Sequence, residues 1–187
     1  EARVLMMSTN NILSPSNGKP IIVPSQDIVL GIYYLSIMRE NQIGQGRSFV
    51  NLNEITKALE NKDISLHSKI IARIKNYDGA FSRVETTPGR MILGSILPVN
   101  ENISFELLNK ILTKKEVSNI IDTVYRFCGQ KETVIFADKI MGIGFKYAAM
   151  AGISFGKDDL IIPDDKNILL EKTQSKVQEY ENQYQDG

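Results

Sequence analysis

The sequence predicts an α+β fold that is mostly helical, with a small antiparallel sheet and a C-terminal protruding helix. Apolar residues recur at helical spacing through the stretch 28–38 and again from 114 onward. Alternation of apolar and charged residues, which is typical of strands, is confined to the stretch 66–86. Hydrophobic residues make up 42% of the 187 residues, so the chain has enough of them to form a core.

The N-terminal part predicts the end of a helix, a stiff polar loop and the start of a second helix. The stretch 3–7 closes an apolar-rich helical segment, and the polar run after it favours turns over helix. Ser25 is a good N-cap for the helix that Asp27 opens near the positive end of its dipole. Three prolines fix φ and stiffen the loop: Pro15, Pro20 and Pro24. Such loops often present groups to a ligand, and a well-capped surface turn fits the same residues.

A loop, a short helix and a sheet are predicted next. The loop over 41–46 contains two glycines but lacks the third glycine and the preceding strand of a phosphate-binding loop. Asn51 and Glu54 have the spacing of a capping box, which opens a helix over 51–60.

Three strands make up the predicted sheet. The first two cover 66–75 and 80–86, with a hairpin turn over 76–79. The stretch 89–97 is a third, more buried strand that ends at Pro98. We interpret the exposed cations of the sheet as a solvated face or a subunit contact rather than a nucleic-acid patch: Lys69, Arg73, Lys75 and Arg83.

Helices dominate the second half of the chain. A helix over 104–112, capped by its first residue, precedes a second capping box over 113–116, which opens a helix that Gly129 ends. The following helix, 132–151, is rich in small residues, which favour tight internal packing or docking against a neighbouring subunit. From Asn167 a narrow apolar stripe predicts a long amphipathic helix that needs one partner helix.

Composition excludes several classes of function. Lys plus Arg and Asp plus Glu each total 22, so the basic excess of a stand-alone nucleic-acid-binding protein is absent. With one Cys and one His, neither an internal disulfide nor a Cys/His zinc pattern is possible. Cys128 lies on an apolar helical stripe and His67 at a strand start, so no nucleophile–base pair supports an independent hydrolase. The aspartate pairs 158–159 and 164–165 are interpreted as helix caps and solvated loop residues.

Blocks of residues along the chain match, in order, one family of proteins. The matching blocks are Ser14-Pro15, Asn17, Pro20, Gln26-Asp27, Gly89-Arg90, 133–138 and 158–163. Through them the chain resembles the largest subunit of multisubunit RNA polymerases, and specifically bacterial β′. The resemblance spans nearly the whole chain apart from a variable stretch, 40–85. It implies the β′ pore region, domain 3, over 1–163, with 130–163 at the junction with the funnel. Residues 164–187 then resemble the truncated first arm of the helical hairpin at the secondary-channel rim.

The resemblance implies a role in the secondary channel of a DNA-directed RNA polymerase, a nucleotidyltransferase. Nucleotides enter through this channel, and the RNA 3′ end is extruded through it during backtracking. The implied channel-lining residues are Asn10, Asn11, Gln26, Asp27 and Arg90. The magnesium-binding aspartates of the family lie upstream of Glu1, so no catalytic residue, metal or cofactor is implied for this piece alone. Mg²⁺ and Zn²⁺ are expected elsewhere in the full subunit.

Two further sites and a set of partners follow from the resemblance. Lys131, Ile135 and Asp138 match a pocket that binds the alarmone (p)ppGpp beside ω in some β′ subunits, but Gly142 stands where an aromatic residue is expected. The terminal helix matches the docking site of Gre-type and related channel factors through Glu171, Gln178, Tyr180 and Glu181. The implied partners are the β, α and ω subunits, a σ factor in the holoenzyme, NTPs and nascent RNA, in the cytoplasm and without a membrane.

Both ends of the sequence are helical segments without a natural boundary, which we interpret as the ends of an excised piece. The alternative is a free-standing α+β module that binds a protein partner without enzymatic activity. Poor solubility or self-association of the isolated chain would favour the subunit piece, whereas a very stable monomer would favour the free-standing module.

Overall fold

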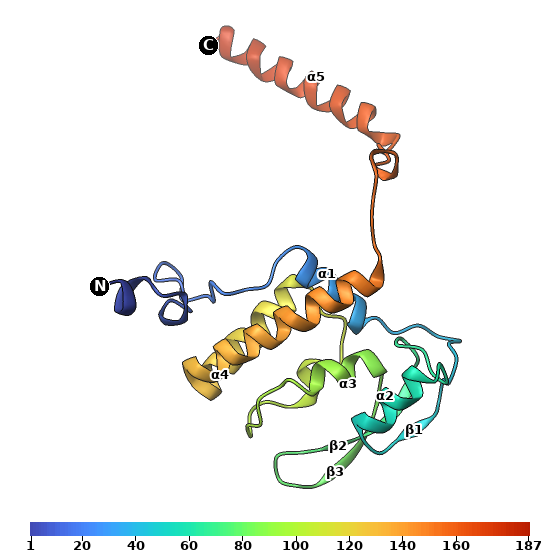
Figure 1. Cartoon of the computed structure of the whole chain (residues 1–187). Coiled ribbons are helices and arrows are strands. Elements are labelled where there is room, and N and C mark those ends of the chain that lie inside the picture. Colours follow the sequence, from blue (N-terminus) through green and yellow to red (C-terminus); the bar gives the residue numbers. More distant parts are fainter. The chain divides into compact units, whose positions relative to one another are not determined.

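The computed structural model describes residues 1–187 and confirms the α+β fold class (Figure 1). The chain divides into two compact units, Glu1–Gly152 and Ile153–Gly187. None of its helices combines the length and the apolar composition needed to cross a membrane.

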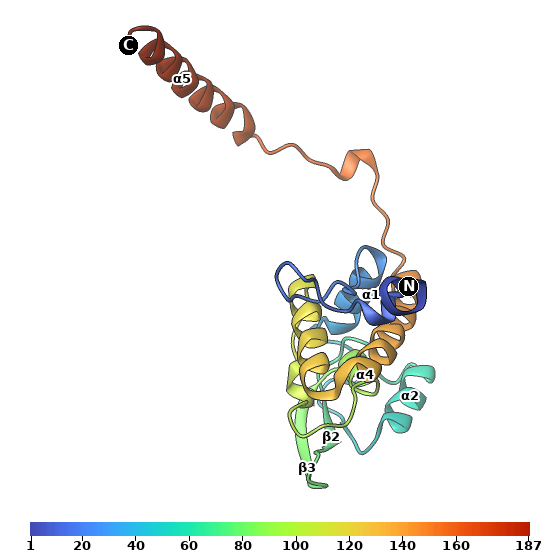
Figure 2. The same ribbon diagram turned by 90° about the vertical axis from the view of Figure 1, so that its left-hand side faces the viewer.

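Two helices build the main core of the first unit. α1 (Asp27–Ser36) packs against α4 (Lys114–Ala151), and Figure 2 shows α1 beside α4. Helical spacing puts the apolar residues of each helix on the shared face. The fully or almost fully buried side chains of this core include Ile32, Leu35, Leu93, Leu112, Val117, Ile121, Val124 and Phe136.

α4 contains a break at Gly129, whose φ of 78° and ψ of −177° are not helical. The predicted end of one helix at this glycine is therefore confirmed, and the second helix follows directly in the same element. Gly152, with φ 59°, ends α4 in the left-handed region, a conformation that glycine adopts without steric cost.

The sheet has the order β1 (Ser48–Phe49), β2 (Ile70–Lys75), β3 (Phe81–Thr86). β2 and β3 form the predicted antiparallel hairpin, and Gly79 in its turn has φ +83°. β1 pairs parallel with β2, so the sheet is mixed rather than purely antiparallel. On one side it packs with α2 (Leu52–Glu60) around a second small core that includes Ile55 and Ile70.

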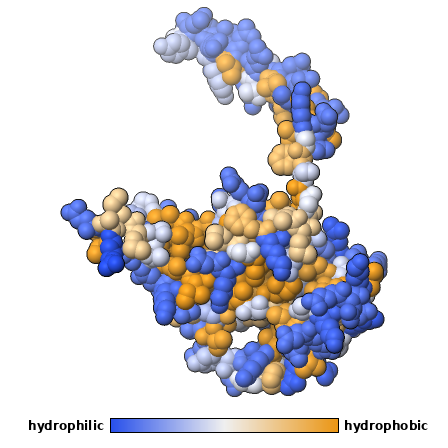
Figure 3. Space-filling model, viewed as in Figure 1, coloured by the Kyte–Doolittle hydropathy of each residue, from blue (hydrophilic) through white to orange (hydrophobic).

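The capping prediction for α2 is confirmed. Asn51 Oδ1 accepts from the Glu54 backbone N–H at 2.9 Å, and Glu54 Oε2 accepts from the Val50 N–H at 2.8 Å. Ile55 is the one buried residue of this helix. Figure 3 accordingly shows hydrophilic residues gathered over α2. At the start of α4, Thr113 Oγ1 accepts from the Glu116 N–H at 3.4 Å, whereas the Glu116 carboxylate pairs with Lys110 instead of bonding back to the backbone.

Three local predictions are wrong. The stretch 89–97 is not a third strand, because Pro88–Gly94 forms helix α3 with Thr87 as its N-cap. Proline is well suited to the first helical position, since its missing N–H would have no partner there. The expected helix over 104–112 shortens to the single turn Phe105–Leu107, and Ser104 makes no side-chain cap. Gln26, not Ser25, is the N-cap residue of α1.

The second unit consists of a connecting segment with one short turn and of α5 (Asp165–Gln185). Asp159 Oδ2 accepts from the Gly156 N–H at 2.7 Å, so this aspartate caps the turn Lys157–Asp159. α5 has no buried residue, and its apolar stripe of Leu170, Val177, Tyr180 and Tyr184 is exposed.

Candidate functional site

The polar loop near the N-terminus is held together by its own asparagines. The Asn10 side-chain amide donates to the Arg3 carbonyl at 3.0 Å. The Asn11 amide donates to the carbonyls of Leu5 and Met7, at 2.9 and 3.0 Å. Both NH₂ groups therefore stabilise the preceding helical turn, Ala2–Met6. These two predicted site residues shape the loop, and their amide donors are already engaged.

Gln130 connects this loop to α4, and the sequence analysis did not identify it. Its side-chain amide donates to the Thr9 carbonyl and, at 3.1 Å, to Asn10 Oδ1. The residue follows the break at Gly129 directly, so the kink aims a polar side chain at a segment 120 positions earlier in the chain. A glycine followed by a polar residue between two helical patterns was the available signal.

Side chains satisfy the backbone carbonyls near the break in α4. Thr133 Oγ1 donates to the Gly129 carbonyl at 2.7 Å, and Asn100 Nδ2 donates to the Phe127 carbonyl at 3.1 Å. These bonds give donors to carbonyls beside the break and so hold the kinked geometry.

Gln26 and Asp27 are the predicted channel-lining residues whose side chains remain free. Both are exposed, and neither side chain makes a hydrogen bond within the chain. Gln26 has φ 52° and ψ −125°, a backbone conformation that costs a non-glycine residue of order 1–3 kcal/mol. Asp27 lies in the first turn of α1, where the helix dipole favours its negative charge.

A basic groove lies between the polar loop and the start of α4. It has a volume of about 840 Å³, and its cations are Lys19, Lys114, Lys115 and Arg126. Arg126 pairs with Asp122 at 2.7 Å, whereas the three lysines form no ion pair within the chain. The loop is stiffened at this point by Asn17 Oδ1, which accepts from the Lys19 N–H at 3.0 Å. The groove was not predicted from the sequence, because Lys19 lies about 95 positions before Lys114 and Lys115.

Arg90 lies in the interior of the first unit, with only 5% of its surface exposed. Its Nε donates to the Ser36 carbonyl at 2.9 Å, and Nη1 donates to the backbone and side-chain oxygens of Asn109 at 3.3 and 3.2 Å. No carboxylate pairs with it, and burial lowers the pKa of the guanidinium. In this structure Arg90 ties α1, α3 and the 104–112 segment together.

The remaining predicted site residues are exposed on helices. Lys131, Ile135 and Asp138 follow each other on one face of α4, and Gly142 continues that face. Glu171 and Gln178 share a face of α5, whereas Tyr180 lies on another side, and all are exposed. No group of three or more His, Cys, Asp or Glu side chains is arranged to hold a metal ion.

The family model of RNA polymerase Rpb1, domain 3, matches residues 11–160. The match covers the N-caps Asn51 and Thr113, the sheet, α1 to α4 and most of the polar loop. The chain belongs to this family, the third domain of the RNA polymerase largest subunit. Its class is therefore that of DNA-directed RNA polymerase, a nucleotidyltransferase of transcription, and its partners include other subunits of the polymerase.

Proposed function

We propose that the chain is the pore region of a bacterial β′ subunit, that it lines the secondary channel, and that it supports the active centre without catalysing a reaction alone. The family match over 11–160 carries this proposal. It is supported by the exposed, unengaged side chains of Gln26 and Asp27 beside a loop that is braced from α4. In this assignment the residues 1–163 form the pore domain and 164–187 form the first arm of the rim hairpin, in a cytoplasmic enzyme.

The chemistry of these groups suits passage of a ligand rather than its retention. The Gln26 amide both donates and accepts hydrogen bonds, so it can contact a nucleotide or an extruded RNA end without a fixed charge. The unpaired lysines of the basic groove, at 19, 114 and 115, add cations that attract a triphosphate. Asn10, Asn11 and Arg90 act in this account as supports for the channel wall.

The test is made in the assembled polymerase. Gln26→Ala is expected to change the rate of elongation or of backtracked-RNA cleavage, because it removes a free amide from the channel wall. Asn102→Ala is the matched control, since Asn102 is also exposed and its side chain makes no hydrogen bond. Elongation and cleavage rates equal to wild type in Gln26→Ala would contradict the assignment.

A second site on the same unit is proposed for (p)ppGpp, with Lys131, Ile135 and Asp138 on one face of α4. The missing aromatic at Gly142 weakens this site by one stacking contact. A Cβ added at Gly142 meets no atom within 4 Å, and the position is exposed, so a side chain can start there without a clash. Calorimetry with the holoenzyme should show tighter (p)ppGpp binding for Gly142→Tyr than for Gly142→Ala. No heat of binding in either variant would remove this site.

The exposed stripe of α5 supports a proposal that the second unit docks channel factors of the Gre type. Glu171, Gln178 and Glu181 provide hydrogen-bonding and acidic groups, and Tyr180 provides an aromatic contact. Replacing Tyr180 by Ala in the holoenzyme should weaken the binding of a Gre-type factor. An unchanged dissociation constant would contradict docking at the Tyr180 side of α5.

A further inference from the structure

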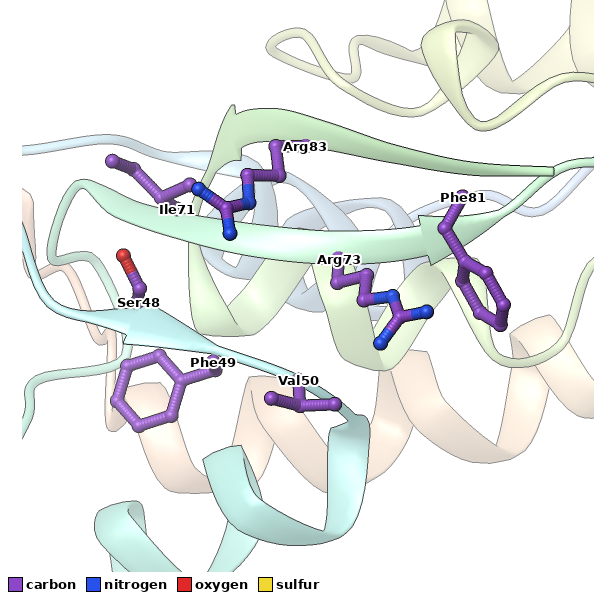
Figure 4. Close-up of a pocket in the computed structure, with 7 residues that line it drawn as sticks. All are labelled: Ser48, Phe49, Val50, Ile71, Arg73, Phe81 and Arg83. Atoms are coloured by element: carbon purple, nitrogen blue, oxygen red, sulfur yellow. The ribbon is translucent and has the colours of Figure 1, made fainter.

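The outer face of the sheet forms a groove that the channel assignment does not use. The groove is lined by residues of all three strands and has a volume of about 430 Å³ (Figure 4). Because side chains alternate along a strand, Ile71 and Arg73 of β2 lie on the opposite side from the buried Ile70 and Ala72. Figure 4 shows the guanidinium groups of Arg73 and Arg83 extending over this face.

The charge on this face is uncompensated within the chain. Arg73 and Arg83 are directly opposite each other in the β2–β3 register. Like charges at such positions destabilise a sheet. The one carboxylate of the face, on Glu85, pairs with Lys69, and neither arginine forms an ion pair. The isolated sheet therefore carries an unfavourable pair of cations that an anionic ligand would relieve.

Apolar groups accompany the two arginines. The Arg73 guanidinium carbon lies 3.7 Å from the centre of the Phe81 ring, and this cation–π contact orients the guanidinium. Val50 and Phe81 are 58% and 55% exposed, so the groove has apolar walls open to a partner. Arginine presents paired donors that match a carboxylate bidentately.

We propose that this face binds an acidic peptide segment of another polymerase subunit, with a carboxylate held by Arg73 and Arg83 and a neighbouring apolar side chain against Val50 and Ile71. A peptide fits better than RNA, because single-stranded nucleic acid needs open aromatic faces for base stacking. Here Arg73 occupies one face of the Phe81 ring, and the other aromatic residue of the groove, Phe49, is buried. The proposal rests on the sheet alone and is independent of the channel assignment.

The experiment places a photo-crosslinking amino acid at Val50 in purified, assembled polymerase. The expected product joins Val50 to a segment of another subunit that contains Asp or Glu within a few residues of the crosslink. Its yield should fall at least tenfold in the double variant Arg73→Glu, Arg83→Glu. Crosslinking to RNA or DNA, no crosslink to another subunit, or an unchanged yield in the double variant would overturn the proposal.

A milder substitution, Arg83→Gln, tests the proposal in case the double variant does not fold. The crosslinked segment, made as a synthetic peptide, is titrated against the full chain. Arg83→Gln should raise its Kd about ten- to a hundredfold, the range expected for losing a hydrogen bond to a charged group. Lys139→Gln is the control, because it removes one exposed cation from α4, away from the sheet. Equal dissociation constants for both variants would also contradict the proposal.

Discussion

A single methyl group at Gly31 should destabilise the first unit, because α1 and α4 meet there backbone to backbone. A Cβ built on Gly31 would lie 1.9 Å from the Gly144 carbonyl oxygen and 2.8 Å from the Ala148 nitrogen. Gly144 is equally constrained, since its Cβ would lie 2.5 Å from the Ile28 side chain. The small residues of α4 thus serve internal packing at Gly144, one of the two roles that the sequence suggested.

The magnitude follows from two opposing terms. Overpacking in a well-packed core costs about 1–3 kcal/mol, and the upper end applies at Gly31 because helix backbone cannot rotate away. Alanine gains up to about 1 kcal/mol over glycine in helix propensity. Gly31→Ala should therefore lower the free energy of unfolding by about 2 kcal/mol. Gly142→Ala should raise it by up to about 1 kcal/mol, because no atom lies within 4 Å of the added carbon.

Urea unfolding of the full chain, followed by circular dichroism, measures both variants. The two substitutions are chemically identical and change helix propensity by the same amount. The difference between their free energies of unfolding therefore measures the steric cost at the contact between α1 and α4. Equal stability of Gly31→Ala and wild type would refute the packing argument. A loss of stability in Gly142→Ala similar to that in Gly31→Ala would refute it as well.

Three further predictions concern the polar groups of the first unit. Arg90→Ala should lower the free energy of unfolding by about 2–4 kcal/mol, because it leaves the buried Ser36 carbonyl and the partly buried oxygens of Asn109 without this donor. Unchanged stability in a denaturant titration would contradict this. Burial lowers the pKa of His67 in the folded chain below its ordinary value of 6.5. Below about pH 6.5 the imidazole is therefore protonated more readily in the unfolded chain, so the free energy of unfolding falls as the pH drops. Thermal melts between pH 5 and 7.5 should show a steeper loss for wild type than for His67→Gln, and parallel curves would contradict this. Gln130→Ala should speed hydrogen exchange of the Asn10 backbone N–H with little change in the free energy of unfolding, because the loop loses its contact with α4. An unchanged exchange rate would mean that Gln130 does not brace the loop.

Local signals in the sequence were enough for several elements. Asn51 with Glu54, and Thr113 with Glu116, place polar side chains where free helix N–H groups need acceptors, so two helix starts were predicted correctly. The hairpin turn that ends at Gly79 was also local, because a residue with positive φ is required there.

The failures have two physical origins. The Thr87–Pro88 helix start was overlooked because the apolar run after it resembles a buried strand, and short apolar runs fit both structures. The helix predicted over 104–112 was wrong because tertiary contacts determine the conformation of this segment. Its Leu112 N–H donates to Ser36 Oγ at 2.9 Å, across 76 positions, and its Asn109 serves Arg90.

The candidate site divides in the same way. The start of α1 at Asp27 was predicted correctly, because it depends on a local helix-start signal. The engagement of the Asn10 amide with the Arg3 carbonyl and with Gln130 depends on how the loop folds back, which no local pattern encodes. The burial of Arg90 could not be read from the Gly89-Arg90 motif, because its hydrogen-bond partners come from distant parts of the chain, such as Ser36.

The central claim is that the polar loop and the start of α1 line the channel that receives extruded RNA. The most direct measurement places a photo-crosslinking amino acid at Gln26 in the assembled polymerase and compares backtracked with actively elongating complexes. The account predicts a crosslink to the RNA 3′ end that increases with backtracking, and no such crosslink from the same probe at Asn102. Absence of an RNA crosslink at Gln26 in backtracked complexes, with crosslinking to protein retained, would contradict it.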